Sequence, residues 1–208
     1  MKYLHSKNRL ESVSDAVFAF AATLMVVNIG VNSDITSFAD EIPNFISFAV
    51  SFFVMMAIWK VHYNFFRRTN HIDNWIIALN MILLFTVLFY IFPIKSLLST
   101  AFKGNTINAD EFSNIFQLYS IGFSLIFLCF YLMYVRVYKK DKNQTKNLKN
   151  LFYARHFLLF VIIGILSFIV AKSQIGLRFG APGFLYAFLG PLCYFHSKWF
   201  HKKHNLEY

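Results

Sequence analysis

The chain has 208 residues, of which 57% are hydrophobic and only 14% are charged. A soluble domain carries roughly 25% charged residues, so this composition leaves too few to cover a water-facing surface. The net charge of +10 would suit a nucleic-acid partner, but the Lys and Arg residues cluster between apolar runs. Composition and charge placement therefore exclude an ordinary soluble protein, predict an integral membrane protein and argue against nucleic-acid binding.

Apolar runs of the length of a transmembrane helix, about 20 residues, recur along the whole sequence. No soluble domain separates them, so residues 1–208 are expected to form one unit. The fold class that we predict is all-α, a polytopic bundle of six transmembrane helices. The expected spans cover about residues 12–31, 42–66, 75–102, 112–138, 151–171 and 175–199.

Proline and glycine mark the least regular parts of this pattern. Pro93 is expected to kink or end the third helix, because proline removes a backbone donor. The sixth span is interrupted most often, at Gly176, Gly180, Pro182, Gly183, Gly190 and Pro191. Its boundaries are therefore the least defined of the six.

The orientation follows from the basic residues near the ends of the spans, since loops rich in Lys and Arg stay in the cytoplasm. Basic residues occupy the N-terminus, the second-to-third connection, the fourth-to-fifth linker and the C-terminal tail. The opposite connections carry Asp34, Asp40, Glu41, Asp110 and Glu111 instead. Both termini are accordingly expected on the cytoplasmic side.

The first span begins with the densest set of polar residues in an apolar context. Ser12 and Asp15 have the spacing of a capping box, in which each side chain bonds to the other's backbone amide. Alternatively, Asp15 is a carboxylate at the membrane edge that needs a partner. Arg9 precedes Asp15 by six residues and so cannot simply face it on one helix. Partners on other helices would be needed. Candidates at the same side of the membrane are Trp59, Lys60 and His62 at the end of the second span and Asn74, Trp75 and Asn80 in the first turns of the third.

One stripe of the first span consists of Phe20, Thr23, Leu24 and Val27. Their spacing of i, i+3, i+4 and i+7 places them on one face of a helix. Such a stripe usually reflects packing, and the Thr23 hydroxyl can bond back to the carbonyl of Ala19. A face that lines a pore is the functional alternative.

The two cysteines, Cys129 and Cys193, both lie inside apolar runs. They lack the spacing of a disulfide framework or of a zinc site. We therefore predict no metal site and treat both cysteines as packing residues.

At these residues the sequence resembles the transmembrane protein 175 family of potassium channels. That family begins its first helix with Arg-x-x-x-Phe-Ser-Asp, and Arg9, Ser14 and Asp15 match, whereas Val13 stands in the place of Phe. The Ala-rich continuation to Thr23 is also similar. The likeness extends to Trp59-x-x-His62 in the second helix and to Asn80 in the third.

The resemblance implies a homotetramer that conducts monovalent cations, K⁺ in particular, passively across the cell membrane, with no cofactor and no enzymatic activity. Four copies of the first helix would line the pore through Phe20, Thr23, Leu24 and Val27. The residues implied to form a supporting polar network are Arg9, Ser14, Asp15, His62 and Asn80. Phe20 departs from the family, which usually places an aliphatic residue three positions before this Thr.

Two other classes of protein remain as alternatives. His62 and His156 both lie near the cytoplasmic side, where they would suit a membrane haem or redox protein. A small secondary transporter is the third possibility. It would need broken helices at mid-membrane in both halves of the chain, and only the sixth span is interrupted in this way.

Overall fold

In the computed structural model, residues 7–27, 38–103, 108–140 and 144–204 are described, and nearly all of them are helical. The expected all-α fold is confirmed. The elements, in chain order, are α1 (Lys7–Val27), α2 (Phe38–Arg68), α3 (Asn74–Lys103), α4 (Ala109–Lys140), α5 (Gln144–Ser173), the 3₁₀ turn η1 (Leu177–Phe179), α6 (Ala181–Phe184), the 3₁₀ turn η2 (Leu185–Phe188) and α7 (Leu189–His204).

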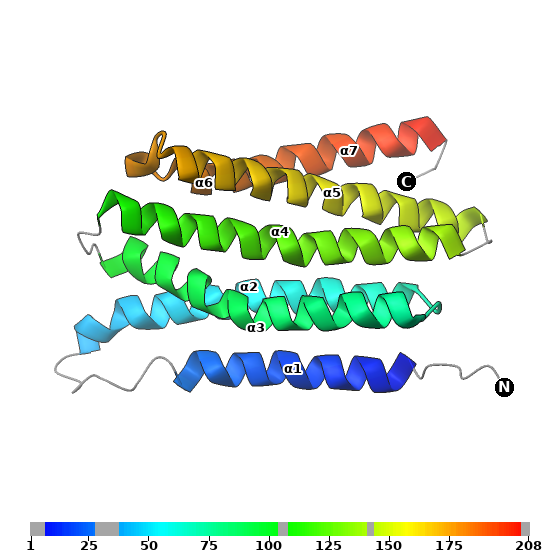
Figure 1. The fold of residues 1–208 in the computed structure, drawn as a ribbon, viewed down its shortest axis with the longest axis horizontal. Coiled ribbons are helices and arrows are strands. Elements are labelled where there is room, and N and C mark those ends of the chain that lie inside the picture. The colour runs from blue at the N-terminus through cyan, green and yellow to red at the C-terminus, as the bar shows by residue number, and fades with distance from the viewer. Residues whose placement is uncertain (1–6, 28–37, 104–107, 141–143, 205–208) are drawn as a thin grey trace.

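The long helices lie side by side as an elongated bundle (Figure 1). α4 is central, because it packs against both α3 and α5, while α2 packs on α3. α1 lies at one side of the bundle, in contact with α2 and α3, and α7 packs on α5 at the other side (Figure 1). Small residues allow the close contact of α4 with α5: a Cβ atom at Gly164 would overlap the Ser124 hydroxyl.

Within the described ranges, five helices, α1 to α5, are long and apolar enough to cross a membrane. Each is longer at one or both ends than its apolar run. α5, for example, has 30 residues, or about 45 Å of helix, whereas the hydrocarbon core is about 30 Å thick. The apolar run predicts the part inside lipid, and the helix continues beyond it through polar residues. The end of the first expected span, residues 28–31, lies outside the described residues.

α3 does not end at Pro93 but continues to Lys103. Its axis bends in the half of the helix that leads to α4 (Figure 1). A bend of this kind is expected where proline removes a backbone hydrogen bond inside a helix. Of the two outcomes expected at Pro93, the kink agrees with the structure and the helix end was wrong.

The expected sixth span is divided into short segments. Gly176 and Gly180 adopt left-handed backbone conformations, with φ of 64° and 70°, and they bound the turn η1. The chain then becomes helical again at Ala181 and runs as α6, η2 and α7 back along α5. Glycine adopts positive φ without the steric cost of a side chain, which explains why the reversal occurs at these residues.

Hydroxyl groups hold this segment against α4 and α5. Ser167 on α5 donates to the carbonyl of Pro182 at 3.0 Å, and its oxygen lies 2.8 Å from that of Ser120 on α4. The hydroxyl of Tyr186 in η2 donates to the Ser120 oxygen at 3.1 Å. The bond from Ser167 satisfies the carbonyl of Pro182, a backbone group in the break between α5 and α7, and the other two bonds tie the hydroxyls of the three segments together.

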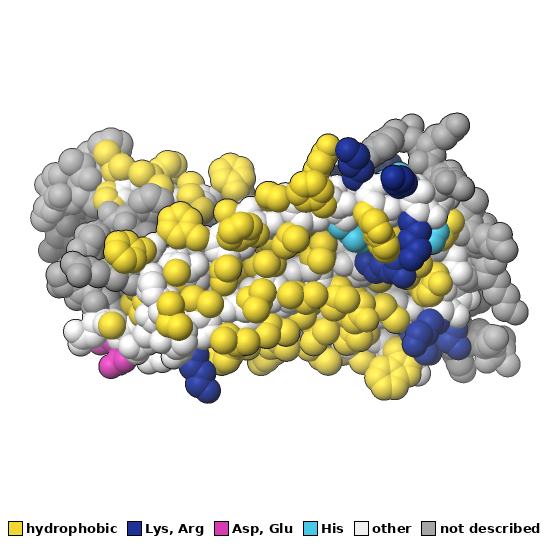
Figure 2. Space-filling view, turned by 90° about the horizontal axis from the view of Figure 1, so that it is seen from above, with side chains coloured by type: hydrophobic (Ala, Val, Ile, Leu, Met, Phe, Trp, Pro, Cys, Tyr) yellow, Lys and Arg dark blue, Asp and Glu magenta, His cyan; other side chains and the backbone are white. Residues whose placement is uncertain are grey.

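Charge is unevenly distributed along the bundle. α1 begins and α7 ends at the same end of the molecule (Figure 1), and most of the Lys and Arg side chains visible in Figure 2 lie toward that end. Hydrophobic side chains cover most of the middle. The acidic first turn of α4, with Asp110 and Glu111, lies at the opposite end. This separation agrees with the basic and acidic connections recognised in the sequence.

Candidate functional site: the first helix and its polar anchor

One face of α1 is buried against α2 and α3. Its buried residues are Ser14, Phe18, Ala21 and Met25, which follow one another at helical spacing. Because Ala21 is fully buried and has only a methyl side chain, the neighbouring helices can approach closely there. This face fixes the rotation of α1 about its own axis, and it therefore determines which residues face outward.

A buried chain of hydrogen bonds anchors this face. His62 Nε2 lies 2.8 Å from Asn80 Oδ1, Asn80 Nδ2 donates to Ser14 Oγ at 3.0 Å, and Ser14 Oγ donates to the carbonyl of Leu10 at 2.8 Å. An amide oxygen can only accept, so His62 carries its proton on Nε2 in this arrangement. The three side chains are buried and join α1, α2 and α3. The structure thus brings together Ser14, His62 and Asn80, three of the five residues expected in the polar network.

Aromatic rings enclose the imidazole of His62. Its ring centroid lies 5.4 Å from that of Phe18 on α1 and 4.8 Å from that of Phe66 on α2. These contacts restrict the orientation of the ring, which keeps Nε2 directed at Asn80. Phe18 is a member of the site that sequence reasoning missed, since one more Phe in an apolar span carries no distinguishing signal.

Asp15 has a separate partner. Its Oδ1 accepts a hydrogen bond of 2.8 Å from the indole Nε1 of Trp59 on α2. The capping-box alternative is wrong, because α1 already extends from Lys7 and Ser12 lies inside the helix. Asp15 therefore joins α1 to α2 through Trp59, one of the candidate partners expected on the same side of the membrane.

Arg9 is exposed in the first turns of α1. It precedes Phe20 by eleven residues, about three helical turns, so both lie on the same side of the helix. Its participation in the polar network stays a prediction.

The opposite face of α1 is uncovered in the single chain. Phe20 is 57% exposed and Val27 is 63% exposed, Thr23 is exposed too, and Leu24 is partly buried. The Thr23 hydroxyl donates to the carbonyl of Phe20 at 2.7 Å, rather than to that of Ala19. Its oxygen keeps lone pairs that can accept from, or coordinate, another group. Of the four residues expected to line a pore, Phe20, Thr23 and Val27 thus lie on the side of α1 that faces away from the polar anchor, and Leu24 lies at the edge of that side.

An ion pair that the sequence did not reveal joins the α2–α3 connection to α4. Arg136 Nε lies 2.7 Å from Asp73 Oδ2, and the backbone N–H of Ile76 donates to Asp73 Oδ1 at 3.1 Å. Partial burial acts to raise the pKa of the Asp73 carboxyl. The bonds from Ile76, Arg136 and His71 outweigh burial and hold that pKa below its ordinary value. Asp73 thus caps α3 and holds its start against α4.

The haem and redox alternative gains no support from this geometry. His62 Nε2 forms a hydrogen bond with Asn80, and His156 packs against His196 on α7 with ring centroids 5.8 Å apart. Among the residues that the structure describes, no three His, Cys, Asp or Glu side chains gather as metal ligands. The break between α5 and α7 likewise has no counterpart in α1 to α3, as a transporter with repeated halves would require.

Fold and site together define a multi-pass membrane protein whose first helix is anchored on one face and open on the other. Comparison with known families agrees: the model of the endosomal/lysosomal potassium channel TMEM175 family matches residues 9–90. This segment begins at Arg9 and includes every residue named above on the two faces of α1, with their partners on α2 and α3. Over this part of the chain, the sequence is therefore similar to the TMEM175 family.

Relatives and solved structures give the same result. A potassium channel of Marivirga tractuosa is 36% identical over 148 residues, 64% of this chain and 60% of that protein. A potassium channel of a Chryseobacterium strain is 32% identical over 38% of this chain and 43% of the relative. The chain thus spans less than two thirds of the length of these relatives.

A variant of the potassium channel MtTMEM175 shares the fold with a TM-score of 0.75 and 27% identity, over 96% of this chain and 95% of that one. A lysosomal potassium-selective channel TMEM175 homolog from Chamaesiphon minutus has a TM-score of 0.61 and 22% identity, over 88% and 97% of the two chains, and supports the fold.

Proposed function

We propose that this chain is the pore-forming subunit of a potassium-selective cation channel of the cell membrane, in which four copies place α1 around one central path. The observation that carries the proposal is the two-faced character of α1. One face is held by the chain Ser14–Asn80–His62, while Phe20, Thr23 and Val27 stay uncovered. The names of the relatives, which are potassium channels, support the choice of ion.

A single copy cannot enclose an ion path with one helix, so the proposal requires oligomerisation. In a tetramer with α1 at the axis, Phe20 and Val27 would form apolar rings that narrow the pore and resist wetting. Thr23 would place an oxygen between these rings, where its lone pairs can replace part of the water around a cation. Leu24 would lie beside this path, and Asp15 and Arg9 would hold the end of the helix.

The transmembrane arrangement that we propose has six spans, with both termini in the cytoplasm. Residues 181–204 would form the sixth span, because α6, η2 and α7 follow one another and run back along α5. The basic end of the bundle, where α1 begins and α7 ends, would then face the cytoplasm (Figure 1). Residues 1–208 would act as one unit.

Ion flux through the reconstituted protein tests the proposal. Liposomes that contain the full chain and a K⁺ gradient should develop a K⁺-dependent membrane potential, and a Na⁺ gradient should produce a smaller one. Thr23→Val, which is nearly isosteric but lacks the hydroxyl, should reduce the preference for K⁺ over Na⁺ without changing assembly. A protein that is folded and tetrameric but gives no cation-dependent potential would contradict the proposal, as would flux that saturates and requires a coupling ion.

A further inference from the structure

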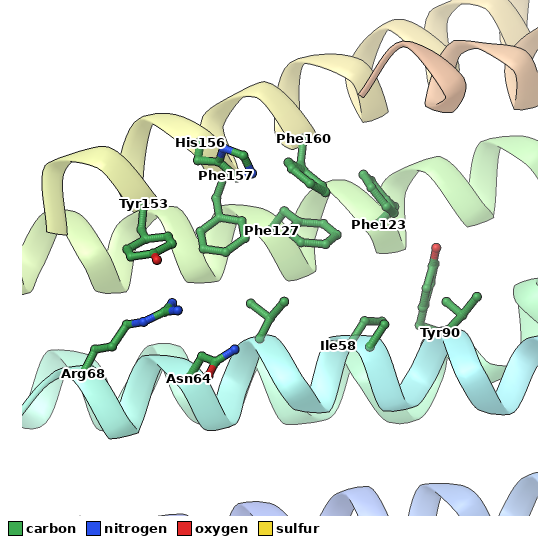
Figure 3. A pocket seen from close by; sticks show the side chains of 13 residues that line it. Ile58, Asn64, Arg68, Tyr90, Phe123, Phe127, Tyr153, His156, Phe157 and Phe160 are labelled. Carbon is green, nitrogen blue, oxygen red and sulfur yellow. The ribbon is translucent and has the colours of Figure 1, made fainter. Parts of the chain in front are cut away.

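A groove of about 420 Å³ lies between α2 and α5, away from the face of α1 described above. It arises because α2 packs on α3 and α5 packs on α4, whereas α2 and α5 do not pack closely on each other. Figure 3 shows α2 and α3 between α1 and this groove. The groove is therefore separate from the helix that we place at the channel axis.

Most of the groove is apolar and parallel to the helices. Along α2 its lining runs from Val54 to Arg68, fifteen residues that span about 21 Å of helix. One leaflet contributes about half of the ~30 Å hydrocarbon core, so the groove is long enough for one acyl chain. Aromatic rings from α4 and α5 form the facing wall, and the centroids of Phe127 and Phe160 are only 4.5 Å apart. Because these rings pack on one another, the wall keeps its shape without an occupant.

One end of the groove is polar and positively charged. Asn64 and Arg68 from α2 and Tyr153 from α5 line it, and Figure 3 shows Arg68 reaching across toward Tyr153. The Arg68 guanidinium carbon lies 4.1 Å from the centroid of the Tyr153 ring. Stacking of this kind orients the plane of the guanidinium, whose several N–H groups point outward in that plane and can donate to acceptors. Among the described residues, the ion pairs within 4.0 Å involve Asp73 and not Arg68.

We propose that this groove is a binding site for an anionic phospholipid, with one acyl chain along the aromatic wall and the phosphate against Arg68. The charge of the headgroup complements that of Arg68, and the basic end of the bundle raises the local concentration of anionic lipid. A basic pocket between transmembrane helices is a known arrangement for such headgroups. The site has the apolar length and the single cation that this ligand requires.

Lipid retention measures this site directly and independently of ion flux. The full-length protein is reconstituted in vesicles of equal phosphatidylcholine and phosphatidylglycerol, extracted in detergent and analysed by native mass spectrometry. We expect the wild type to retain more phosphatidylglycerol than phosphatidylcholine. Arg68→Gln should lower retained phosphatidylglycerol about fivefold, the factor that corresponds to ~1 kcal/mol for one basic residue. Arg68 is exposed, so this change leaves the core intact.

Arg67→Gln is the matched control, because Arg67 is also an exposed basic residue in the last turn of α2 but does not line the groove. It should leave the lipid ratio unchanged. Ala57→Phe, which fills the groove, should reduce retention of both lipids, and an excess of inorganic phosphate should not displace phosphatidylglycerol. Equal losses in Arg67→Gln and Arg68→Gln would overturn the site, since they would indicate a general surface charge. Unchanged lipid retention with altered subunit stoichiometry in Ala57→Phe would also overturn it, by assigning the groove to a second copy of the chain.

Discussion

Asn80 occupies the centre of the buried hydrogen-bond chain, because its amide accepts from His62 and donates to Ser14. Neither neighbour has water within reach to replace it, since all three side chains are buried. Each group therefore depends on the orientation of a single amide, and the chain joins three helices that are far apart in the sequence. This chain of hydrogen bonds therefore fixes the rotation of α1 about its own axis.

Replacement of Asn80 should consequently be costly. Asn80→Leu leaves the buried imidazole donor of His62 and the Ser14 oxygen without their partner. We therefore expect the free energy of unfolding to fall by about 1–3 kcal/mol. Thermal unfolding of the purified protein in detergent would measure this loss as a lower Tm. Asn74→Leu is the control, because Asn74 begins the same helix and is exposed. Equal Tm values for the two variants would show that the hydrogen-bond chain does not stabilise the bundle.

Asp73 should make stability depend on pH in a defined direction. Its pKa in the folded protein lies below the ordinary value of 3.8, so its contribution is fully present above that value. The contribution is lost as pH falls from 3.8 through the lower, folded-state pKa. The Tm difference between wild type and Asp73→Asn should accordingly be constant from pH 7 to about pH 5 and shrink in stronger acid. A difference that grows toward acid would contradict the sign of this pKa shift.

At the scale of elements, the break between α5 and α7 depends on the hydroxyl contacts of Ser120, Ser167 and Tyr186. Ser167 is fully buried, and it both donates to Pro182 and contacts Ser120. Without these bonds, the short helix α6 and the turn η2 would be held to the bundle by their apolar contacts with α4 and α5. The segment is then expected to open more often than the long helices that flank it.

Ser167→Ala should test this role by faster hydrogen exchange of the backbone amides in residues 181–188. Amides of α1 should be unaffected, because the substitution is on the opposite side of the bundle. Ser173→Ala provides the control, since Ser173 is exposed and its hydroxyl donates to the carbonyl of Val170 in its own helix. The account of the break would be wrong if exchange in residues 181–188 stayed at the wild-type rate.

Sequence reasoning predicted the helices better than their ends or their partners. The apolar runs indicate α1 to α5, because the spans in lipid must be both apolar and helical. Helix ends lie in the interface, where hydropathy no longer follows the backbone, so α1 begins at Lys7 rather than Ser12. The stripe of Phe20 is visible from its spacing. Trp59 was one of several candidate partners for Asp15, chosen by its side of the membrane, and the sequence alone did not single it out. The Arg68–Tyr153 contact depends on long-range packing that no local pattern encodes.

At the scale of the whole molecule, the path of residues 181–204 determines the topology. Six spans return the C-terminus to the side of the N-terminus, whereas five spans place the two on opposite sides. A green fluorescent protein fused to either terminus in a bacterial host should be fluorescent in both fusions, because it folds in the cytoplasm. Fluorescence of the N-terminal fusion alone would contradict the six-span arrangement and the proposed orientation of the basic end.

The central claim, that the exposed face of α1 lines a cation path, is tested most directly by comparing Phe20→Ala with Val26→Ala. The two side chains are equally uncovered in the single chain, at 57% and 55% exposed, but lie about 120° apart around the helix. Met25 would be a poor control, since it is 3% exposed and packs in the core.

Cation flux into liposomes, with K⁺ and Na⁺ measured separately, is the decisive measurement. Removal of four phenyl rings from the narrowest part of the pore should raise flux in Phe20→Ala and weaken the discrimination between K⁺ and Na⁺. Val26→Ala should resemble the wild type in both respects. Equal effects of the two substitutions, or no effect of Phe20→Ala in a conducting protein, would contradict the account and show that this face packs against protein or lipid.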